Sequence, residues 1–181
     1  MLRESLSDGT VTIRRFDLND LERDLEAKDE EQIKWLWGAE DREKWVAMSS
    51  DQRRTHARAT ITMYRDTFGP GPKWSFAVDA DDESYVAYVD CDLANQHVPH
   101  GQANVAYASH PAFRGSGYVS RAVRLVFRYL EENTEATEAH INVAADNEPS
   151  LRVAREVGAE AANQWVDEQG NSMIRFVYRL R

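Results

Sequence analysis

Apolar and polar residues alternate with a period of two in several short segments, which is the pattern of β-strands with one buried face. In Gln102–Ser109, for example, Val105 and Tyr107 fall on one side of the segment and Asn104 and Ala106 on the other. At the end of the chain, the alternating residues Ile174, Phe176, Tyr178 and Leu180 predict a buried face. Strands are predicted over Thr10–Arg15, Lys73–Asp79, Ser84–Leu93, Gln102–Ser109, His140–Ala144, Ala159–Val166 and Ser172–Leu180.

Other segments repeat their apolar residues every three or four positions, as amphipathic helices do. Asp17 can cap a helix whose apolar residues are leucines, and further helices are predicted over Glu30–Trp37 and Asp51–Thr67. The strongest repeat predicts a helix from Tyr118 to about Leu130. The residues that share its apolar face are Val119, Ala122, Val123, Val126, Phe127 and Leu130.

Turn residues separate these segments. Gly69–Pro72 (GPGP) ends the helix before it and precedes the first strands of the sheet. Asp79–Glu83 forms an acidic turn between two strands, which predicts a β-hairpin. No internal repeat is apparent. Strands and helices therefore follow one another in mixed order, and the predicted fold class is α/β.

Length and composition favour one domain. With 181 residues, 42% of them hydrophobic, the chain can bury a substantial core, and we expect a single domain over residues 1–181. No apolar run is long enough for a membrane span, and the first residues, MLRESLSDGT, lack the apolar core of a signal peptide. Cys91 is the only cysteine. We expect it to be a buried thiol rather than a nucleophile, in a cytoplasmic protein.

The segment His110–Tyr118 (HPAFRGSGY) combines the end of a strand, an arginine, two glycines and the start of a helix. Pro111 stops the strand because proline cannot donate a hydrogen bond to the sheet. Gly115 and Gly117 allow backbone N–H groups to approach an anion closely, and the dipole of the following helix favours negative charge at its N-terminus. The segment therefore predicts a phosphate-binding turn.

Charge along the chain agrees with an anion at this turn. The protein has 22 Lys and Arg against 31 Asp and Glu, yet Leu93–Leu130 contains no Asp or Glu. Arg114 lies in the turn. Arg121, Arg124 and Arg128 follow on one side of the helix, where they are either further phosphate ligands or a solvated basic face. The negative net charge speaks against nonspecific binding of nucleic acid.

The turn lacks the third glycine of a dinucleotide-binding G-x-G-x-x-G motif and the Gly-Lys-Ser/Thr of a Walker loop. Instead, Arg114–Val119 (RGSGYV) resembles the R-x-x-G-x-G/A signature of the GNAT N-acetyltransferases, with Val119 where the family places glycine or alanine. The longer segment YASHPAFRGSGY is similar to the ribosomal-protein alanine N-acetyltransferase branch. Downstream, Asp146–Ser150 followed by LRVAREVGA resembles that branch's Asn-x-x-Ser helix, which closes on a glycine, here Gly158.

The resemblance implies the GNAT fold, in which helices flank a single mixed, mostly antiparallel central sheet. It also implies acetyl-CoA as the acyl-donor substrate, held by its pyrophosphate at the glycine turn, and no metal. The implied contacts of this donor are Tyr107, Ala108, Ser109, Arg114, Gly115, Ser116, Gly117, Tyr118, Val119 and Asn147.

Transfer to an amine requires the neutral amine, and an alkylamine with a pKa of about 10.4 is neutral in only about one part in a thousand at pH 7. The resembling family often uses a glutamate in or beside the central strand as the base, but Gln102 and Asn104 occupy that neighbourhood. His110 and Asp90 are the nearest candidates for the base, with Asp92 beside the latter. Each also fits a structural role, because the histidine can cap the strand end and the aspartates can face solvent.

The CoA thiolate that leaves also needs a proton or a hydrogen bond. Many members of the resembling family use a tyrosine seven residues after the motif asparagine, but that position is Ala154 here. The resemblance implies Ser150 in this role, and the alternative is that Ser150 caps the following helix. By the same resemblance, a backbone N–H between Ala108 and His110 polarises the acetyl carbonyl.

Acidic residues and tryptophans are the indications of the acceptor. Asp79–Asp92 contains six acids and no Lys or Arg, which would attract a cation. Trp35, Trp37 and Trp45 fit either the wall of a substrate groove or ordinary helix packing.

We therefore expect an acetyl-CoA-dependent N-acetyltransferase that acts by direct transfer in a ternary complex. The expected acceptor is a primary amine, either a protein N-terminus or a small cationic amine such as an aminoglycoside-type antibiotic. The alternative is an acyl-CoA-binding protein with little or no catalysis. Neither nucleic acid nor a membrane is an expected partner. Whether the chain forms a homodimer is left open.

Overall fold

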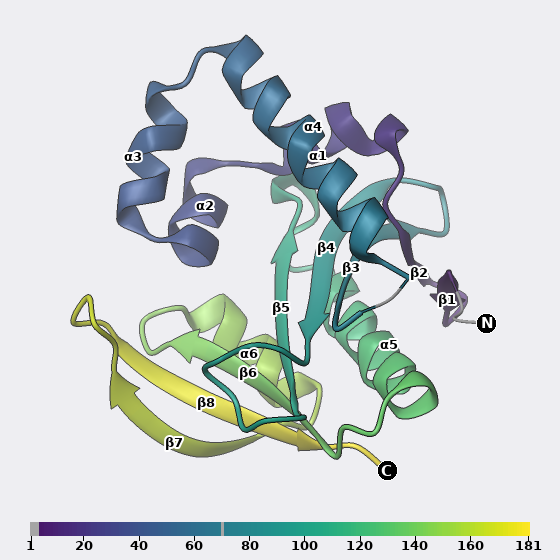
Figure 1. Cartoon of the computed structure of the whole chain (residues 1–181), viewed down its shortest axis with the longest axis vertical. Coiled ribbons are helices and arrows are strands. Elements are labelled where there is room, and N and C mark those ends of the chain that lie inside the picture. The colour runs from purple at the N-terminus through teal and green to yellow at the C-terminus, as the bar shows by residue number, and fades with distance from the viewer. Residues whose placement is uncertain (1–3, 70) are drawn as a thin grey trace.

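The computed structural model describes residues 4–69 and 71–181, with only the backbone described at positions 37 and 39. Within these residues, eight strands form one sheet in the order β1-β2-β3-β4-β5-β6-β8-β7 (Figure 1). Every neighbouring pair is antiparallel except β5 and β6. The strands are β1 (Ser5–Ser7), β2 (Val11–Arg15), β3 (Lys73–Ala80), β4 (Tyr85–Asp92), β5 (Ala103–Ser109), β6 (Glu138–Ala144), β7 (Glu160–Val166) and β8 (Ser172–Arg179).

Helices cover both faces of the sheet, and an apolar cluster lies on each face. Phe76 and Ala77 are neighbours on β3, so their side chains point to opposite faces. Phe76 belongs to the larger cluster with the buried face of α5, whereas Ala77 belongs to a smaller one with residues of α1 and α4. The helices are η1 (Leu18–Asp20), α1 (Leu21–Ala27), α2 (Glu30–Trp37), α3 (Ala39–Ala47), α4 (Ser50–Thr67), η2 (Pro111–Phe113), α5 (Tyr118–Asn133) and α6 (Glu148–Glu156).

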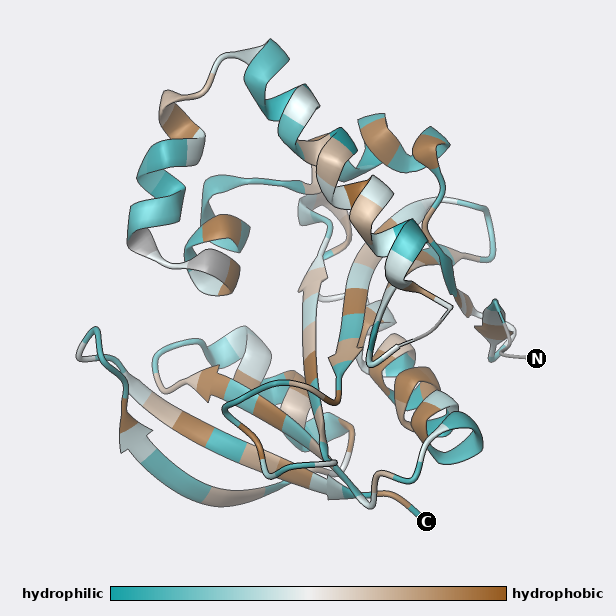
Figure 2. Cartoon of the chain, in the orientation of Figure 1, coloured by the Kyte–Doolittle hydropathy of each residue, from teal (hydrophilic) through white to brown (hydrophobic). Residues whose placement is uncertain are grey.

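The apolar face predicted for α5 is confirmed. All six residues assigned to that face are buried, and Figure 2 shows brown bands along this helix where it lies against the sheet. The mixed, mostly antiparallel sheet flanked by helices is also as predicted. None of the helices within the described part of the chain is long and apolar enough to cross a membrane.

Three elements were not predicted, and one of them is the short helix η2, which lies in the segment interpreted as a turn. The strand β1 has three residues, too few for a period of two to be recognised. The helix α3 (AEDREKWVA) has no apolar stripe and is mostly teal in Figure 2; within its described side chains, Trp45 is the large buried one. The predicted turn Gly69–Pro72 includes Pro70, which lies outside the described residues.

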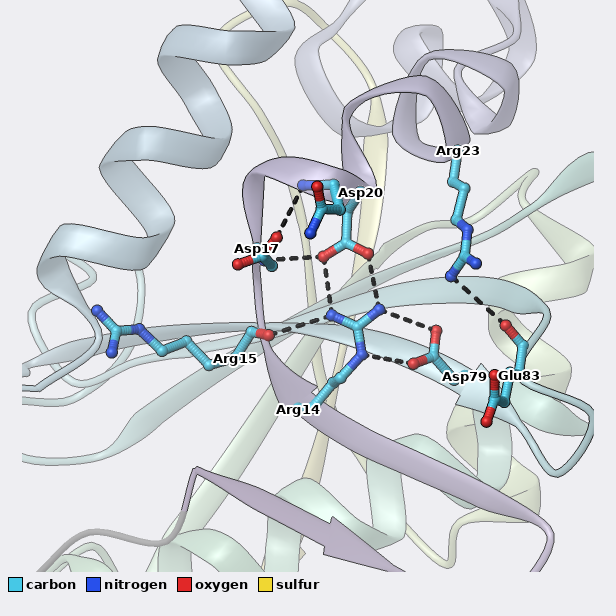
Figure 3. Close-up of polar contacts among 8 residues, drawn as sticks. Arg14, Arg15, Asp17, Asp20, Arg23, Asp79 and Glu83 are labelled. Atoms are coloured by element: carbon cyan, nitrogen blue, oxygen red, sulfur yellow. Dashed lines mark hydrogen bonds and ion pairs between the residues drawn. The ribbon is translucent and has the colours of Figure 1, made fainter.

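An ion pair between Arg14 and a buried carboxylate connects the first helical turns to the sheet (Figure 3). Arg14 on β2 donates to both carboxylate oxygens of Asp20 in η1, at 2.7 and 2.8 Å, and also to Asp79 on β3. Asp20 is 2% exposed, and it also accepts the backbone N–H of Asp17, which caps η1 as predicted. The hydrogen bonds therefore satisfy a carboxylate that would be costly to bury alone.

The sheet opens between β5 and β6. These strands pair only at Ala103 with Ala139 and Asn104 with His140, among the described residues. The strand β5 nevertheless stays paired with β4 up to Ser109, so its other edge is uncovered over its second half. Figure 1 shows the two strands adjacent at one end and diverging toward the other. This divergence positions the candidate site.

Candidate active site

A cavity of about 420 Å³ lies where β5 ends, between the N-termini of α5 and α6 and one side of α2. Its wall contains every implied donor contact except Ser116, and it also contains Ser150. Asp90 and His110 are not among the wall residues. Two motifs separated by about thirty positions of the sequence, the glycine turn and the Asn-x-x-Ser helix, therefore meet at one cavity.

The glycine turn presents backbone N–H groups to this cavity. Gly115 and Gly117 have φ of +82° and +77°, a left-handed conformation that side chains with a Cβ rarely adopt. Gly117 is the N-cap of α5, and no side chain within the described part of the chain caps this sixteen-residue helix. The first N–H groups of a helix have no partner inside it, so those of α5 can bind an anion.

Arg114 is bonded to acidic residues of α2. Its Nη2 lies 2.8 Å from Asp29, the N-cap residue of α2, and its Nη1 lies 3.2 Å from Glu31. Partial burial raises the pKa of Asp29, but the hydrogen bonds from Arg114 and the N–H of Gln32 outweigh burial and hold this pKa below the ordinary value. The carboxylate is therefore ionised at neutral pH.

Leu93–Leu130 contains no acids, but acidic residues outside this stretch pair with two of the three arginines of α5. Arg121 pairs with Asp8 at 2.9 Å, and Arg128 pairs with Glu132. Arg124 donates to the backbone carbonyl of Glu156. None of these three arginines lines the cavity. They are bonded surface residues rather than phosphate ligands of this cavity.

The open edge of β5 supplies a backbone donor. His110 donates its N–H to the carbonyl of Val86 at 2.9 Å, so these residues form a hydrogen-bonded pair. Because such pairs alternate along an antiparallel ladder, Ser109, opposite Ala87, directs its N–H away from β4 and toward the opening. Within Ala108–His110, the N–H of Ser109 is the one directed toward the cavity.

At the N-terminus of α6, the cap is Asn147. Its side-chain oxygen accepts the N–H of Ser150 at 3.2 Å, so the alternative that Ser150 caps this helix is wrong. The hydroxyl of Tyr107 donates to the backbone carbonyl of Ser150 at 3.0 Å and ties β5 to α6. Burial raises the pKa of Tyr107, which keeps this phenol protonated. Ser150 belongs to the cavity wall.

Asp90 is 4% exposed, so the alternative that it faces solvent is wrong. It accepts a hydrogen bond from the hydroxyl of Tyr88, and the ammonium of Lys73 lies 3.0 Å away. Burial raises the pKa of this carboxyl more than Lys73 and Tyr88 lower it. Tyr88 stands opposite Ala108 and Asp90 opposite Ala106, so all four side chains share one face of the sheet.

His110 caps η2, since its Nδ1 accepts the N–H of Ala112 at 3.2 Å. Cys91 is fully buried, and burial raises the pKa of its thiol well above the ordinary value, as expected for a structural cysteine. Ala154 is also fully buried and does not reach the cavity. The described residues contain no group of three or more His, Cys, Asp or Glu placed to hold a metal.

The tryptophans have different surroundings. Trp35 lines the main cavity. Trp45 lines a second hollow of about 370 Å³ between α3 and α4, together with His56 and Tyr64. The side chain of Trp37 lies outside the described residues. The six acids of Asp79–Asp92 do not line the main cavity, and Asp79 is bonded to Arg14.

Sequence reasoning missed Tyr88 and the acids of α2. Tyr88 lies two residues before Asp90 on the same strand, so a period of two places it on the same face, and that signal was available. Asp29 and Glu31 carry no local signal, because they meet Arg114 across more than eighty positions of the sequence.

Residues 10–160 match the family model described as acetyltransferase (GNAT) domain. No curated protein sequence matches the chain. The expectation of a single domain over residues 1–181 stays a prediction.

Solved structures share the fold at low sequence identity. A GNAT-family acetyltransferase from Bacillus anthracis is 13% identical with a TM-score of 0.75, and the match covers 97% of this chain and 98% of that one. The microcin C7 self-immunity acetyltransferase MccE, solved with acetyl-CoA and AMP, is 14% identical with a TM-score of 0.75 over 96% and 93% of the chains. RimL, a ribosomal L7/L12 alpha-N-protein acetyltransferase solved with coenzyme A, is 14% identical with a TM-score of 0.72 over 99% and 97%.

Proposed function

The chain belongs to the acetyltransferase (GNAT) domain family, and on that premise we propose that this N-acetyltransferase moves the acetyl group of acetyl-CoA directly to a primary amine in a ternary complex. One observation carries the proposal: the uncovered edge of β5, the uncapped N-terminus of α5 and the N-terminus of α6 meet at one cavity of about 420 Å³.

The donor would bind across these three elements. Its diphosphate fits the N-terminus of α5, where N–H groups and the helix dipole favour negative charge, with Arg114 beside it. The pantetheine arm would lie in the opening along β5. The carbonyl oxygen of the acetyl group would then accept the N–H of Ser109. This hydrogen bond stabilises the negative charge that develops on the acetyl oxygen during attack.

The acceptor amine must lose a proton as its nitrogen attacks the carbonyl carbon. We assign Asp90 as the base and Tyr88 as the group that connects it to the amine. In this relay the phenol oxygen takes the amine's proton while the phenol passes its own proton to the carboxylate. Burial raises the pKa of Asp90, which makes it a better proton acceptor than an exposed aspartate. The small side chains of Ala106 and Ala108 leave space for the amine on this face.

Breaking the C–S bond releases the CoA thiolate. Ser150 is the proposed donor of a hydrogen bond to the sulfur, since it lines the cavity at the start of α6. A thiol has a pKa of about 8.5, so its thiolate is a tolerable leaving group and a hydrogen bond suffices. His110 is a weaker candidate for catalysis, because its Nδ1 is already an acceptor in the cap of η2.

We propose a protein N-terminal amine as the acceptor, with a small cationic amine as the second candidate. An α-amine with a pKa near 8 loses its proton at a cost of about 1.4 kcal/mol at pH 7, against about 4–5 kcal/mol for an alkylamine. Burial raises the pKa of Asp90, but its pairing with Lys73 offsets part of this rise and makes the carboxylate a weaker base than burial alone would. Such a base suits the less basic amine better, because that amine gives up its proton more easily. Among the proteins with this fold, RimL is described as an alpha-N-protein acetyltransferase.

The deciding experiment combines calorimetric titration of CoA with thiol release from acetyl-CoA over a panel of amines. The panel contains peptides with free N-termini, the same peptides with blocked N-termini, polyamines and aminoglycosides. Turnover on free N-termini that disappears on blocking supports the proposal. CoA binding without turnover on any amine favours a binding protein, and no CoA binding contradicts both.

A further inference from the structure

Arg114 joins the glycine turn to α2. Its two terminal nitrogens each contact one carboxylate, Nη2 that of Asp29 at 2.8 Å and Nη1 that of Glu31 at 3.2 Å. The three side chains are 38%, 35% and 60% exposed, so an incoming ligand can reach all of them. Asp29 and Glu31 hold the only arginine of the turn, and they lie on the helix that forms the opposite wall of the cavity.

The same guanidinium lies where the proposed donor places its diphosphate, at the N-terminus of α5. A guanidinium has five N–H donors that point in fixed directions, and its two terminal nitrogens form the fork that matches a carboxylate or a phosphate. The carboxylates bonded to both terminal nitrogens of Arg114 therefore compete with a phosphate for this fork. The lowered pKa of Asp29 keeps this competitor charged at neutral pH.

Resting on the proposed function, we propose that Asp29 and Glu31 act as internal counter-ions that compete with the diphosphate of the donor for Arg114. Donor binding exchanges the carboxylates for phosphate and releases the first turn of α2 from the glycine turn. Asp29 and Glu31 are thus determinants of donor affinity. Because they belong to the start of α2, they also couple donor binding to the position of this helix.

Release of α2 links the donor to the acceptor. Gln32, Trp35 and Leu36 of this helix line the cavity, so in this proposal the release of α2 from Arg114 also moves residues of the cavity wall. Linkage is reciprocal for binding equilibria, so an acceptor that binds to the released helix also tightens donor binding.

Charge-removing variants test the competition. Asp29→Asn keeps the N-cap of α2, because asparagine caps as well as aspartate, and Glu31→Gln keeps the side-chain length. Glu30→Gln is the matched control, since it removes the same charge from the same turn but pairs with Arg42 instead. Exposed ion pairs each contribute little, so we expect the double variant to bind CoA roughly two- to tenfold more tightly, and Glu30→Gln to change binding less.

Two further titrations separate competition for Arg114 from a general electrostatic effect of removing negative charge. Pantetheine, which lacks the diphosphate, should bind the double variant and the wild type equally. In an Arg114→Ala background the tightening should vanish, because no guanidinium is left to compete for. Tightening that persists there, that extends to pantetheine, or that Glu30→Gln reproduces would overturn the inference.

Failure of this inference is distinguishable from failure of the proposed function. If the wild type binds CoA and the double variant binds it no more tightly, the competition is refuted and the acetyltransferase proposal is unaffected. If neither protein binds CoA, both are refuted. Circular dichroism of each variant, compared with the wild type, verifies that α2 and the fold are retained.

Discussion

Val119 is where the chain departs from the signature it resembles, and the structure gives this side chain two surroundings. It is 9% exposed and packs in the main apolar cluster, and it also forms part of the cavity wall. A residue in the first turn of α5 thus contributes to core packing and borders the proposed diphosphate site at once. Glycine or alanine there would give up packing in exchange for space.

Val119→Ala separates these two effects. We expect it to bind CoA more tightly, because two methyl groups leave the cavity wall, and to lower the free energy of unfolding by about 1–2 kcal/mol through lost packing. Alanine is preferable to glycine, which costs about 1 kcal/mol more in a helix. Titration calorimetry and urea unfolding measure the two quantities. Unchanged or weaker CoA binding would show that the valine does not crowd the ligand.

Tyr88 and Asp90 make the proposed relay testable. We expect Tyr88→Phe and Asp90→Asn to lower kcat/KM by roughly 10²- to 10³-fold with the Kd of CoA unchanged, because each removes proton transfer but not donor contacts. Phenylalanine keeps the ring that stacks on Tyr64 at 5.5 Å. Asp92→Asn is the control, since this acid neighbours Asp90 and bonds the N–H of Ala94 instead. Equal losses in all three variants would argue against a relay.

The pH profile gives the relay an independent signature. Asp90 works as the carboxylate, so activity falls when the pH drops through its pKa, which burial raises above 3.8. The amine also gains a proton as the pH falls, so log kcat/KM should steepen from a slope of one to a slope of two below the pKa of Asp90. In Asp90→Asn only the amine titrates, and the steeper limb should be missing.

At the scale of elements, α6 is bounded by two local devices. Asn147 caps its N-terminus, and Gly158 follows its C-terminus with φ of +86°. The N–H of Gly158 bonds to the carbonyl of Arg155, and the N–H of Ala159 bonds to that of Ala154, so the last carbonyls are satisfied. These bonds fix the length of the helix, and with it the place of Ser150 at the cavity.

Gly158→Ala should lower the free energy of unfolding by about 1–2 kcal/mol, because a Cβ disfavours this left-handed backbone. Space is not the reason, since the nearest atom to an added Cβ, on Tyr178, would be 3.9 Å away. Gly69→Ala is the control: this glycine has no positive φ and no atom near its Cβ position, so we expect a change within about 0.5 kcal/mol. Similar losses at both positions would contradict the conformational argument.

The ion pair of Arg14 connects two other elements, η1 and the sheet. Arg14→Met should lower the free energy of unfolding by about 2–4 kcal/mol, because it leaves the buried carboxylate of Asp20 without its cation. Asp79→Asn should cost less than about 1 kcal/mol, since Arg14 keeps Asp20 and asparagine can still accept a hydrogen bond. Urea unfolding of both variants measures the difference, and equal effects would show that Asp20 is not the critical partner.

At the scale of the whole molecule, the sheet consists of two parts that meet at β5 and β6. Only two residue pairs join these strands, among the described residues, although α5 packs beneath both parts. The cavity lies beside the second half of β5, where this pairing is missing. A ligand bound there would contact β5 of the first part and α6, which precedes the strands β7 and β8 of the second part. Its binding should therefore raise the free energy of unfolding of the whole molecule.

CoA at about 100 times its Kd should stabilise the protein by about 2.7 kcal/mol, which corresponds to a rise in Tm of about 5–10 °C for a chain of this size. Scanning calorimetry at increasing CoA concentration measures the shift. Arg114→Ala should show a smaller rise at the same concentration. A Tm that stays constant up to millimolar CoA would show that CoA does not bind the folded protein in this concentration range.

Much of the site could be read from the sequence because its signals are local. The end of β5, the glycine turn and the start of α5 follow one another within a few residues, and the cap and closing glycine of α6 do the same. Periods of two or of three to four residues and single turn residues act over that range. They were sufficient for most strands and helices and for the buried face of α5, whereas the arrangement of the sheet and the donor contacts in the cavity wall were implied by the family resemblance.

The sequence by itself therefore determined most of the elements and the chemical character of the turn. Only the tertiary structure decided what surrounds it: the acids of α2 on Arg114, the lysine and tyrosine on Asp90, and the divergence of β5 from β6. The reason is physical. Charge and burial depend on distance in space, and a stretch without acids along the chain receives them from segments that fold against it.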